Sequence, residues 1–398
     1  MTQTVFPKHG KNEHSKNLRT FGVEEEFLLV DGCSGQPVAV AELSLSGYRQ
    51  LEGGPGRPAL TLEVKQEQIE AVDPICSTVE EMASAIRAGR LLADETARSV
   101  GARAVALATS PVPTTPTLVP QPRYLNMAAR FGLTLKEQLT CGFHVHVLIN
   151  SDEEGVAILD RIRVWLPTVL ALSANSPFWM GTASGYASFR YQAWSRWPTA
   201  GPCERFGSVE EYRGHIQSLL TAGILLDEGM IYFDARLSRN HPTVEVRIAD
   251  VCLDARDATV IAVVVRALVE RAAQEWAAGS PAPQASAALL RLAGWKASSA
   301  GVEGELLHPL LNSPCPAAEA VQALLGHIRP VLARTGDEDK VTSELARILS
   351  SGTGAQRQRK VMLSTQSPAA VVRDAIELTH GSVRPGERPR TRAISLAT

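Results

Sequence analysis

The chain lacks a charge excess of either sign. Its 398 residues include 40 basic and 42 acidic side chains, so the net charge is −2 when the histidines are neutral. A balance this close to zero gives no electrostatic reason to expect binding to nucleic acid or to a membrane surface. We therefore expect partners that are small molecules.

Paired cysteines and long apolar runs are also missing. The six cysteines are scattered without a C-x-x-C pair, which argues against a zinc knuckle or a disulfide framework and is typical of a reducing compartment. No run approaches the ~20 apolar residues that a membrane-spanning helix needs, and the first 20 residues contain no signal-peptide core. These absences predict a cytoplasmic location.

The common nucleotide-binding motifs are absent as well. The chain has neither a G-x-x-x-x-G-K-[ST] phosphate loop nor the glycine fingerprint of dinucleotide-binding folds. If a nucleotide binds here, a metal ion and side chains must hold it.

What the chain contains is a two-part organisation. Strand-like runs are confined to the first two-thirds, and the chain after Asp250 is almost entirely helical, which predicts an α+β fold. Residues 1–19 and 382–398 are polar, and the second stretch is basic, so we expect both to be disordered tails around a single domain of residues 20–381. The strand-like runs are residues 20–30, 60–72, 103–108, 139–149, 230–237 and 243–250.

Three consecutive glutamates interrupt the first run, Phe21–Asp31. Because side chains alternate along a strand, Glu24 and Glu26 share one face and Glu25 lies on the other. Carboxylates in an apolar strand are costly to desolvate unless a positive charge compensates them. A divalent cation and a structural network of arginines or lysines are the two interpretations that the residues leave open.

A second acidic stretch, Leu62–Glu70, carries Glu63 and Glu70. Positions seven apart lie on opposite faces of a regular strand, so these two carboxylates can reach one site only if the chain bends between them. The alternative is an exposed edge strand with solvated acids.

Two histidines, His144 and His146, share one face of the apolar strand Thr140–Leu148. Imidazoles in this register are compatible with metal ligation, phosphate contact or a hydrogen-bonded pair in the core.

The last strand, Thr243–Asp250, projects Glu245 and Arg247 from one face. Asp234 and Arg236 repeat this arrangement on the preceding run. Together the four segments offer many carboxylates and few imidazoles, a ligand set that selects magnesium or manganese over zinc.

A long loop at residues 181–202 combines glycines and aromatic side chains with two cations, Arg190 and Arg196. Planar guanidinium groups on a flexible backbone suit a loop that binds carboxylates or phosphates through paired hydrogen bonds. The alternative is an aromatic-anchored surface loop.

These motifs, in this order, resemble the carboxylate-amine ligase family, also called glutamate–cysteine ligase type 2. That family is related to glutamine synthetase, whose catalytic domain is a curved antiparallel sheet backed by helices, with acids on its concave face that bind magnesium-ATP. The resemblance spans about residues 20 to 380 and rests on Gly22–Phe27, Ile69–Glu70, Cys141–His146, Tyr186–Arg190 with Arg196–Gly201, Thr243–Asp250 and Gly354–Arg359.

The resemblance implies an enzyme that uses ATP to join a carboxylate, the γ-carboxylate of glutamate, to cysteine or another amine through an acyl phosphate. It implies ATP and Mg²⁺ as cofactors, with Mn²⁺ as a substitute, and it is compatible with a homodimer. Arg247 would meet the transferred phosphate and His146 the nucleotide. The implied metal ligands are Glu24, Glu26, Glu63, Glu70, His144 and Glu245, and the implied substrate-binding residues are Tyr186, Arg190 and Arg196.

One segment departs from the family pattern. Where the family has a W-R-A-x-R-Y-G-like stretch, this chain reads Trp295-Lys-Ala-Ser-Ser-Ala-Gly301 and lacks the arginine and the tyrosine. We therefore expect an altered pocket for the donor or the acceptor.

Two other functions stay open at this point. A zinc-dependent hydrolase of the amidohydrolase type would use His144 and His146 as a ligand pair, although such a site wants more imidazoles than these strands supply. A non-catalytic relative of the ligases would account for the departure at Trp295–Gly301, but it gives no reason for several acids to face one cleft.

Overall fold

The computed structural model describes residues 19–48 and 56–381. Apart from Arg19, the two predicted tails lie outside the described residues. Arg19 itself forms ion pairs with Glu154 at 2.6 Å and with Glu270 at 2.7 Å. This residue is therefore tied to the folded part of the chain.

Seven strands of the described chain form one sheet, and each of its pairings is antiparallel. The strand order is β2-β3-β1-β5-β9-β8, and β4 pairs with β1. β1 therefore lies inside the sheet, where both neighbours can add side chains to its acidic face. The strands are β1 Phe21–Val30, β2 Ala59–Leu62, β3 Gln68–Val72, β4 Arg103–Val105, β5 Gly142–Leu148, β8 Ala235–Leu237 and β9 Thr243–Asp250, with small separate pairs β6 Phe178–Trp179/β7 Thr182–Ala183 and β10 Glu305–Leu307/β11 Pro314–Pro316.

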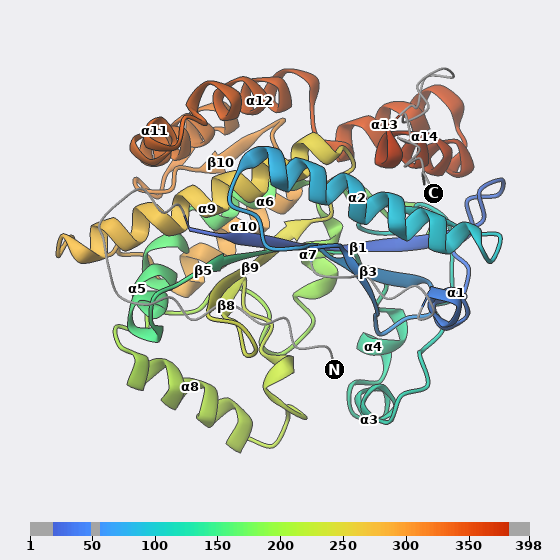
Figure 1. The fold of residues 1–398 in the computed structure, drawn as a ribbon, viewed down its shortest axis with the longest axis horizontal. Helices are drawn as coiled ribbons and strands as arrows, with labels where there is room; N and C mark the ends of the chain where they lie inside the picture. Colours follow the sequence, from blue (N-terminus) through green and yellow to red (C-terminus); the bar gives the residue numbers. More distant parts are fainter. Residues whose placement is uncertain (1–18, 49–55, 382–398) are drawn as a thin grey trace, which may run out of the picture.

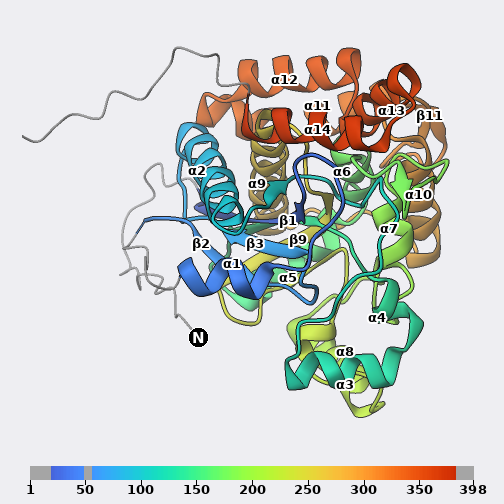
Figure 2. The ribbon, with the colours of Figure 1, turned by 90° about the vertical axis from the view of Figure 1, so that its right-hand side faces the viewer.

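Helices lie on both sides of the sheet. Figure 1 shows α2 and α9 above the sheet, and α3, α4 and α8 below it. Figure 2 shows the same layers from the side, with α12 at the top and α3 and α8 at the bottom. The helices are α1 Ala41–Tyr48, α2 Val79–Arg98, α3 Pro122–Phe131, α4 Leu133–Glu137, α5 Asp152–Ile162, α6 Leu166–Ser173, α7 Phe189–Trp194, α8 Val209–Thr221, α9 Ala255–Ala277, α10 Ala287–Ala300, α11 Ala317–Thr335, α12 Glu338–Ser351, α13 Gly354–Thr365 and α14 Pro368–His380.

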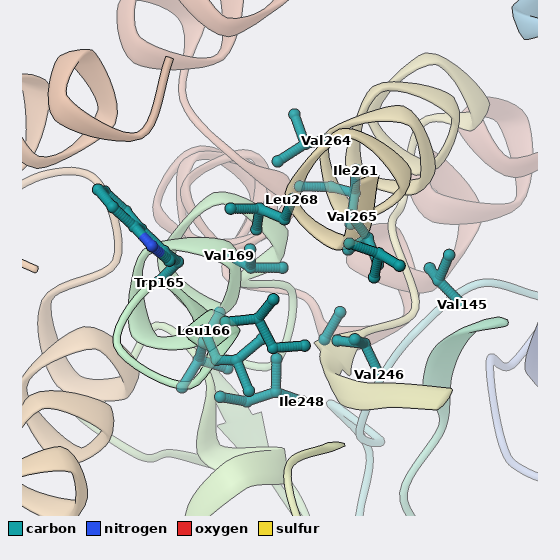
Figure 3. Packing of buried hydrophobic residues seen from close by; sticks show 14 of the residues in the cluster. Val145, Trp165, Leu166, Val169, Val246, Ile248, Ile261, Val264, Val265 and Leu268 are labelled. Carbon is teal, nitrogen blue, oxygen red and sulfur yellow. The ribbon is translucent and has the colours of Figure 1, made fainter. Parts of the chain in front are cut away.

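The main core lies between the sheet and helices α6 and α9. Figure 3 shows Val145 of β5, Ile248 of β9, Leu166 of α6 and Val265 of α9 in one cluster, and each of these side chains is at most 3% exposed. Burying a side chain of this size stabilises the fold by about 1.5–3 kcal/mol. This packing turns the apolar faces of β5 and β9 towards the helices, so the polar residues between them face the other way.

The α+β architecture expected from the sequence is confirmed. The predicted strand at 60–72 is in fact two strands, because the chain turns between β2 and β3. After Asp250 the chain is helical except for the short β10–β11 pair. No helix in the described ranges is both long enough and apolar enough to cross a membrane.

Candidate active site

The alternation of β1 places its three glutamates in two environments. Glu25 points to the helix-covered side, is 1% exposed and forms hydrogen bonds of 3.0 and 2.7 Å with Arg90 of α2. Glu24 and Glu26 lie on the opposite face, where histidines and the backbone N–H of Gly142 contact them. Arginine therefore compensates Glu25, and the other two carboxylates remain available for a ligand.

The turn after β2 brings Glu63 to the same site as Glu70. Glu70 lies opposite Glu26 in the antiparallel register, and one oxygen from each of these three acids lies within 4.8 Å of the others. Glu67 holds the turn, because its two oxygens accept from the N–H of Thr117 at 3.0 and 2.9 Å. The bend that a shared site requires is present, which favours that site over solvated edge acids.

β5 adds two histidines next to Glu24. His144 lies opposite Glu24, with its Nδ1 3.2 Å from Glu24 Oε2, and His146 Nε2 lies 3.5 Å from Glu24 Oε1. His146 Nδ1 is 3.0 Å from the hydroxyl of Thr243. The shared face of the two histidines therefore points at the acids.

β9 supplies an acid between two arginines. Glu245 lies opposite His146 and is 2% exposed. It accepts hydrogen bonds from Arg236 at 2.8 and 3.3 Å and from Arg247. Arg247 Nη1 also lies 3.5 Å from His144 Nδ1, so the cation expected to meet a phosphate borders the acids.

Three overlapping sets of potential metal ligands result, and in each set the ligand atoms lie within 4.8 Å of one another. All six residues implied as metal ligands occur in these sets. His146 occurs as well, although the resemblance implies a contact with the nucleotide for it. The sets, which together form the acid cluster, are Glu24–Glu70–His144, Glu24–His146–Glu245 and Glu26–Glu63–Glu70.

The acids of this cluster perturb one another's ionisation. Burial and then repulsion from Glu26 raise the pKa of Glu63 to about 8. Burial and then Glu24 and Glu63 raise the pKa of Glu70 well above its ordinary value. Burial also opposes ionisation of Glu24, but the charge of His146 and a hydrogen bond with His144 hold its pKa well below the ordinary value. The acids can all ionise at neutral pH only if further positive charge is supplied.

The donor atoms of the acid cluster fit divalent cations. Nε2 of His144 and Nε2 of His146 are buried and form no hydrogen bond of good geometry within the described residues, although Glu26 Oε1 and Glu24 Oε1 lie 3.8 and 3.5 Å from them. Buried polar atoms are seldom left without a partner, and a cation would satisfy these nitrogens while neutralising the acids. Oxygen-rich sets with few imidazoles suit hard cations such as Mg²⁺ and Mn²⁺.

Arg190 of α7 lies beside the strands that carry the cluster. Its guanidinium donates to the carbonyl oxygen of Arg247 at 3.3 Å and lies 3.9 Å from the buried Asp250. Its Nη2 occupies the space that a Cβ at Gly142 would need, and the N–H of Gly142 donates to Glu26 at 2.6 Å. Arg190 thus packs against the backbone of β5 and β9, the strands that carry part of the cluster. Its contact with substrate stays a prediction.

Arg196 and Tyr186 make other contacts. Arg196 forms an ion pair with Glu137 at 2.6 Å, and its Cζ lies 5.7 Å from the ring centre of Trp179. Tyr186 packs edge-on against Trp295, with 6.3 Å between ring centres. These contacts include no member of the acid cluster, so substrate binding by the two residues stays a prediction.

Sequence reasoning missed the residues on another side of the cluster. Tyr232 lies beside Arg123 and Glu63, and burial raises the pKa of its phenol. Burial and then Glu63 raise the pKa of Tyr124 to about 12. Arg123 donates to Asp227 at 2.8 and 2.9 Å across a separation of 104 positions. No local pattern in a sequence signals a contact over such a distance.

The sequence of the chain matches the model of the glutamate-cysteine ligase family 2 over residues 20–382. The chain belongs to this family. A protein of Paenarthrobacter aurescens named "Putative glutamate--cysteine ligase 2-1" is 54% identical over 367 residues, which cover 91% of this chain and 95% of that protein. "Putative glutamate--cysteine ligase 2" of Streptomyces coelicolor is 44% identical over 365 residues, which cover 92% of this chain and 100% of that protein.

Solved structures of ligases share the fold of this family 2 ligase. A bifunctional glutathione synthetase from Pasteurella multocida superposes with a TM-score of 0.65 at 16% identity, over 91% of this chain and 52% of that chain. A glutamate–cysteine ligase from Francisella tularensis, in complex with AMP, gives a TM-score of 0.60 at 13% identity, over 92% and 90% of the two chains. The expected glutamine synthetase-like fold is confirmed.

Family membership makes the chain an ATP-dependent ligase that forms carbon–nitrogen bonds. The zinc-dependent hydrolase is disfavoured on the same ground, and the ligand chemistry agrees, because carboxylates outnumber imidazoles in the acid cluster.

Proposed function

We propose that this family 2 ligase uses ATP to form an amide between the γ-carboxylate of glutamate and a small amine. The observation that carries the proposal is the acid cluster, to which β1, β3, β5 and β9 contribute side chains and which Arg247 borders. Its relatives are named for glutamate and cysteine, and glutamate supplies a carboxylate of the kind that an ATP-dependent ligase activates.

Mg²⁺ is the cation that best matches the ligand sets, with carboxylate oxygens as the main ligands and His144 and His146 as the nitrogen ligands. Divalent cations bound there would neutralise the phosphates of ATP. The strands hold the ligands in place before any substrate arrives, so little reorganisation is needed during the reaction.

A small apolar cavity of about 60 Å³ lies beside the cluster. Phe21, Val23 and Ile75 supply apolar walls, and Glu24 and His146 also line the cavity. Ligand sites commonly measure about 300–1,000 Å³, so this cavity is too small to enclose the base of ATP without a rearrangement of its walls.

The proposed reaction has two steps. The γ-carboxylate attacks the γ-phosphorus of ATP, the bond to the bridging oxygen breaks, and an acyl phosphate and ADP form. The amine then attacks the acyl carbon, and phosphate leaves with one oxygen of the original carboxylate while the amine releases a proton to solvent. Arg247 would neutralise charge on the transferred group, a role in which a preorganised cation is worth ~3 kcal/mol.

The acceptor pocket is proposed to differ from that of the relatives. The departure from the family pattern lies at the C-terminal end of α10, where Ser298 O accepts from the N–H groups of Ala187 and Ser188 at 2.9 and 2.8 Å. Ser299 and Ala300 follow directly, so a cation and an aromatic ring are missing next to this loop. We expect cysteine to be a poor acceptor and another amine to be preferred.

Release of ADP by the purified protein with Mg²⁺, ATP and glutamate, measured across a panel of amines that includes cysteine, tests the proposal. We expect release that depends on Mg²⁺ and on one class of amine. Glu24→Gln should abolish it, whereas Glu210→Gln on the exposed face of α8 should not. Near-normal release by Glu24→Gln would contradict the role of the acid cluster.

The same assay tests the acceptor pocket. Ser299→Arg combined with Ala300→Tyr should shift selectivity between amines and leave the dependence on Mg²⁺ unchanged. Efficient and selective formation of γ-glutamylcysteine by the unaltered protein would contradict the altered pocket while leaving the ligase chemistry intact.

A further inference from the structure

A second cavity lies beyond the edge strand β8. Its volume is about 340 Å³, and the loop at residues 198–206, helix α8 and Arg291 of α10 form its walls. Small-molecule sites commonly measure about 300–1,000 Å³. The cavity shares no lining residue with the small apolar cavity beside the acid cluster, so it is a separate site.

Two opposite charges line this cavity and form no ion pair within the described residues, although the charge of Arg291 also acts on the buried Asp234. The guanidinium of Arg291 and the carboxylate of Glu211 both line it, and neither forms a hydrogen bond or ion pair with another residue in the described ranges. Their neighbours are engaged instead: Glu204 accepts from Ala287 N at 2.9 Å, and Arg205 donates to Ala282 O at 3.5 Å. One cation and one anion are therefore available to a ligand.

Three aromatic rings that lie close to one another also line the cavity. The ring centre of His215 lies 5.7 Å from that of Phe206 and 5.9 Å from that of Phe233, and the ring centres of the two phenylalanines lie 6.4 Å apart. A hydrocarbon side chain would bury apolar area against these rings.

We propose that this cavity binds a free α-amino acid with an apolar side chain. The carboxylate would lie on Arg291, whose planar guanidinium can donate two parallel hydrogen bonds. The ammonium would lie on Glu211, and the side chain would lie on the rings of Phe206 and Phe233. A simple anion such as phosphate fits less well, because Glu211 would repel it.

The walls of the cavity connect to the proposed active site through backbone hydrogen bonds. Gly201 O accepts from Asp234 N at 3.0 Å, and Asp234 O accepts from Arg247 N at 2.9 Å. Thr199 Oγ1 accepts from Tyr232 N at 3.1 Å. A ligand that shifts the loop at residues 198–206 would therefore shift the strand that carries Arg247. This regulation goes beyond the proposed ligase activity.

Binding can be measured without any ligase assay. The twenty common amino acids are screened by thermal shift on the full chain, and L-leucine is then titrated calorimetrically beside L-leucinamide and 4-methylpentanoate, which lack the carboxylate and the ammonium respectively. We expect leucine to bind, and both analogues to bind about tenfold more weakly or worse, because each loses a charged hydrogen bond.

Variants assign the binding to this cavity. Arg291→Leu and Glu211→Gln should each weaken leucine binding by about tenfold or more, whereas Glu210→Gln, one position away on the same helix, should not. The proposal would be overturned if both cavity variants bind leucine as tightly as the unaltered protein does. It would also be overturned if no amino acid raises the melting temperature of the unaltered protein, or if Arg291→Leu keeps every such increase.

The proposed regulation of the ligase by the bound amino acid is tested by a separate measurement. At a fixed subsaturating glutamate concentration, leucine should change the rate of ADP release by about fivefold or more in the unaltered protein and not in Arg291→Leu. An unchanged rate at saturating leucine would overturn the connection to the active site. If ligase activity is absent altogether, the calorimetric result still decides whether the cavity binds an amino acid.

Discussion

Replacing Arg90 by methionine should destabilise the protein far more than any single change in the acid cluster. Arg90 and Glu25 are each 1% exposed, and Arg90 also donates to the carbonyl oxygens of Cys252 at 2.7 Å and Leu253 at 3.0 Å. The substitution leaves a buried carboxylate and three carbonyl groups, the third being that of Thr379 at 3.4 Å, without this donor. Removing one partner of a buried ion pair costs about 3–5 kcal/mol, a large part of the roughly 5–15 kcal/mol that stabilises a typical protein.

Chemical denaturation gives the free energy of unfolding for this test. The double variant Arg90→Met/Glu25→Leu should recover much of the loss, because an apolar pair can replace a buried ion pair at little cost. Glu26→Gln, on the opposite face of β1, serves as the matched control and should not destabilise the metal-free protein, since it relieves repulsion among the acids. A loss below about 1 kcal/mol for Arg90→Met would refute the assignment of Glu25 to a structural role.

Two further predictions concern catalysis and acid stability. Arg247→Lys should lower kcat more than it weakens substrate binding, because lysine keeps the charge but not the planar pair of donors; a change confined to KM would make Arg247 a binding residue only. Burial and then Arg271 lower the pKa of His327 from 6.5 to about 4, although Glu275 Oε1 lies 3.8 Å from its Nδ1. The stability that neutral His327 contributes above pH 6.5 should therefore fall as the pH drops towards 4, by up to about 3 kcal/mol. His327→Phe, which keeps the stack on Trp165 at 4.4 Å, should flatten this dependence in urea denaturation between pH 4 and 7, and an unchanged slope would contradict it.

The faces of the strands could be predicted from the sequence, because alternation is a local property. It separated Glu25 from Glu24 and Glu26, and it placed His144 and His146 on one face. The register between strands could not be predicted in this way. That Glu24 lies opposite His144 depends on pairings between β1 and β5, more than 100 positions apart, which turns and core packing determine together.

Contacts outside the sheet were even harder to predict from the sequence. Arg190 and Arg196 share a loop in the sequence, yet the first is buried beside Asp250 and the second is exposed and paired with Glu137. Composition alone does not tell such arginines apart, because burial depends on how α7 packs. The family resemblance supplied the set of implied metal ligands, and in the structure His146 also lies in one of the potential ligand sets.

Transfer of an oxygen atom from glutamate to phosphate tests the central claim most directly. Glutamate labelled with ¹⁸O in its γ-carboxylate is incubated with the protein, Mg²⁺, ATP and the preferred amine, and the released phosphate is analysed by mass spectrometry. Activation of the carboxylate as an acyl phosphate predicts one ¹⁸O atom in each phosphate released during amide formation. Unlabelled phosphate accompanying amide formation would contradict the account.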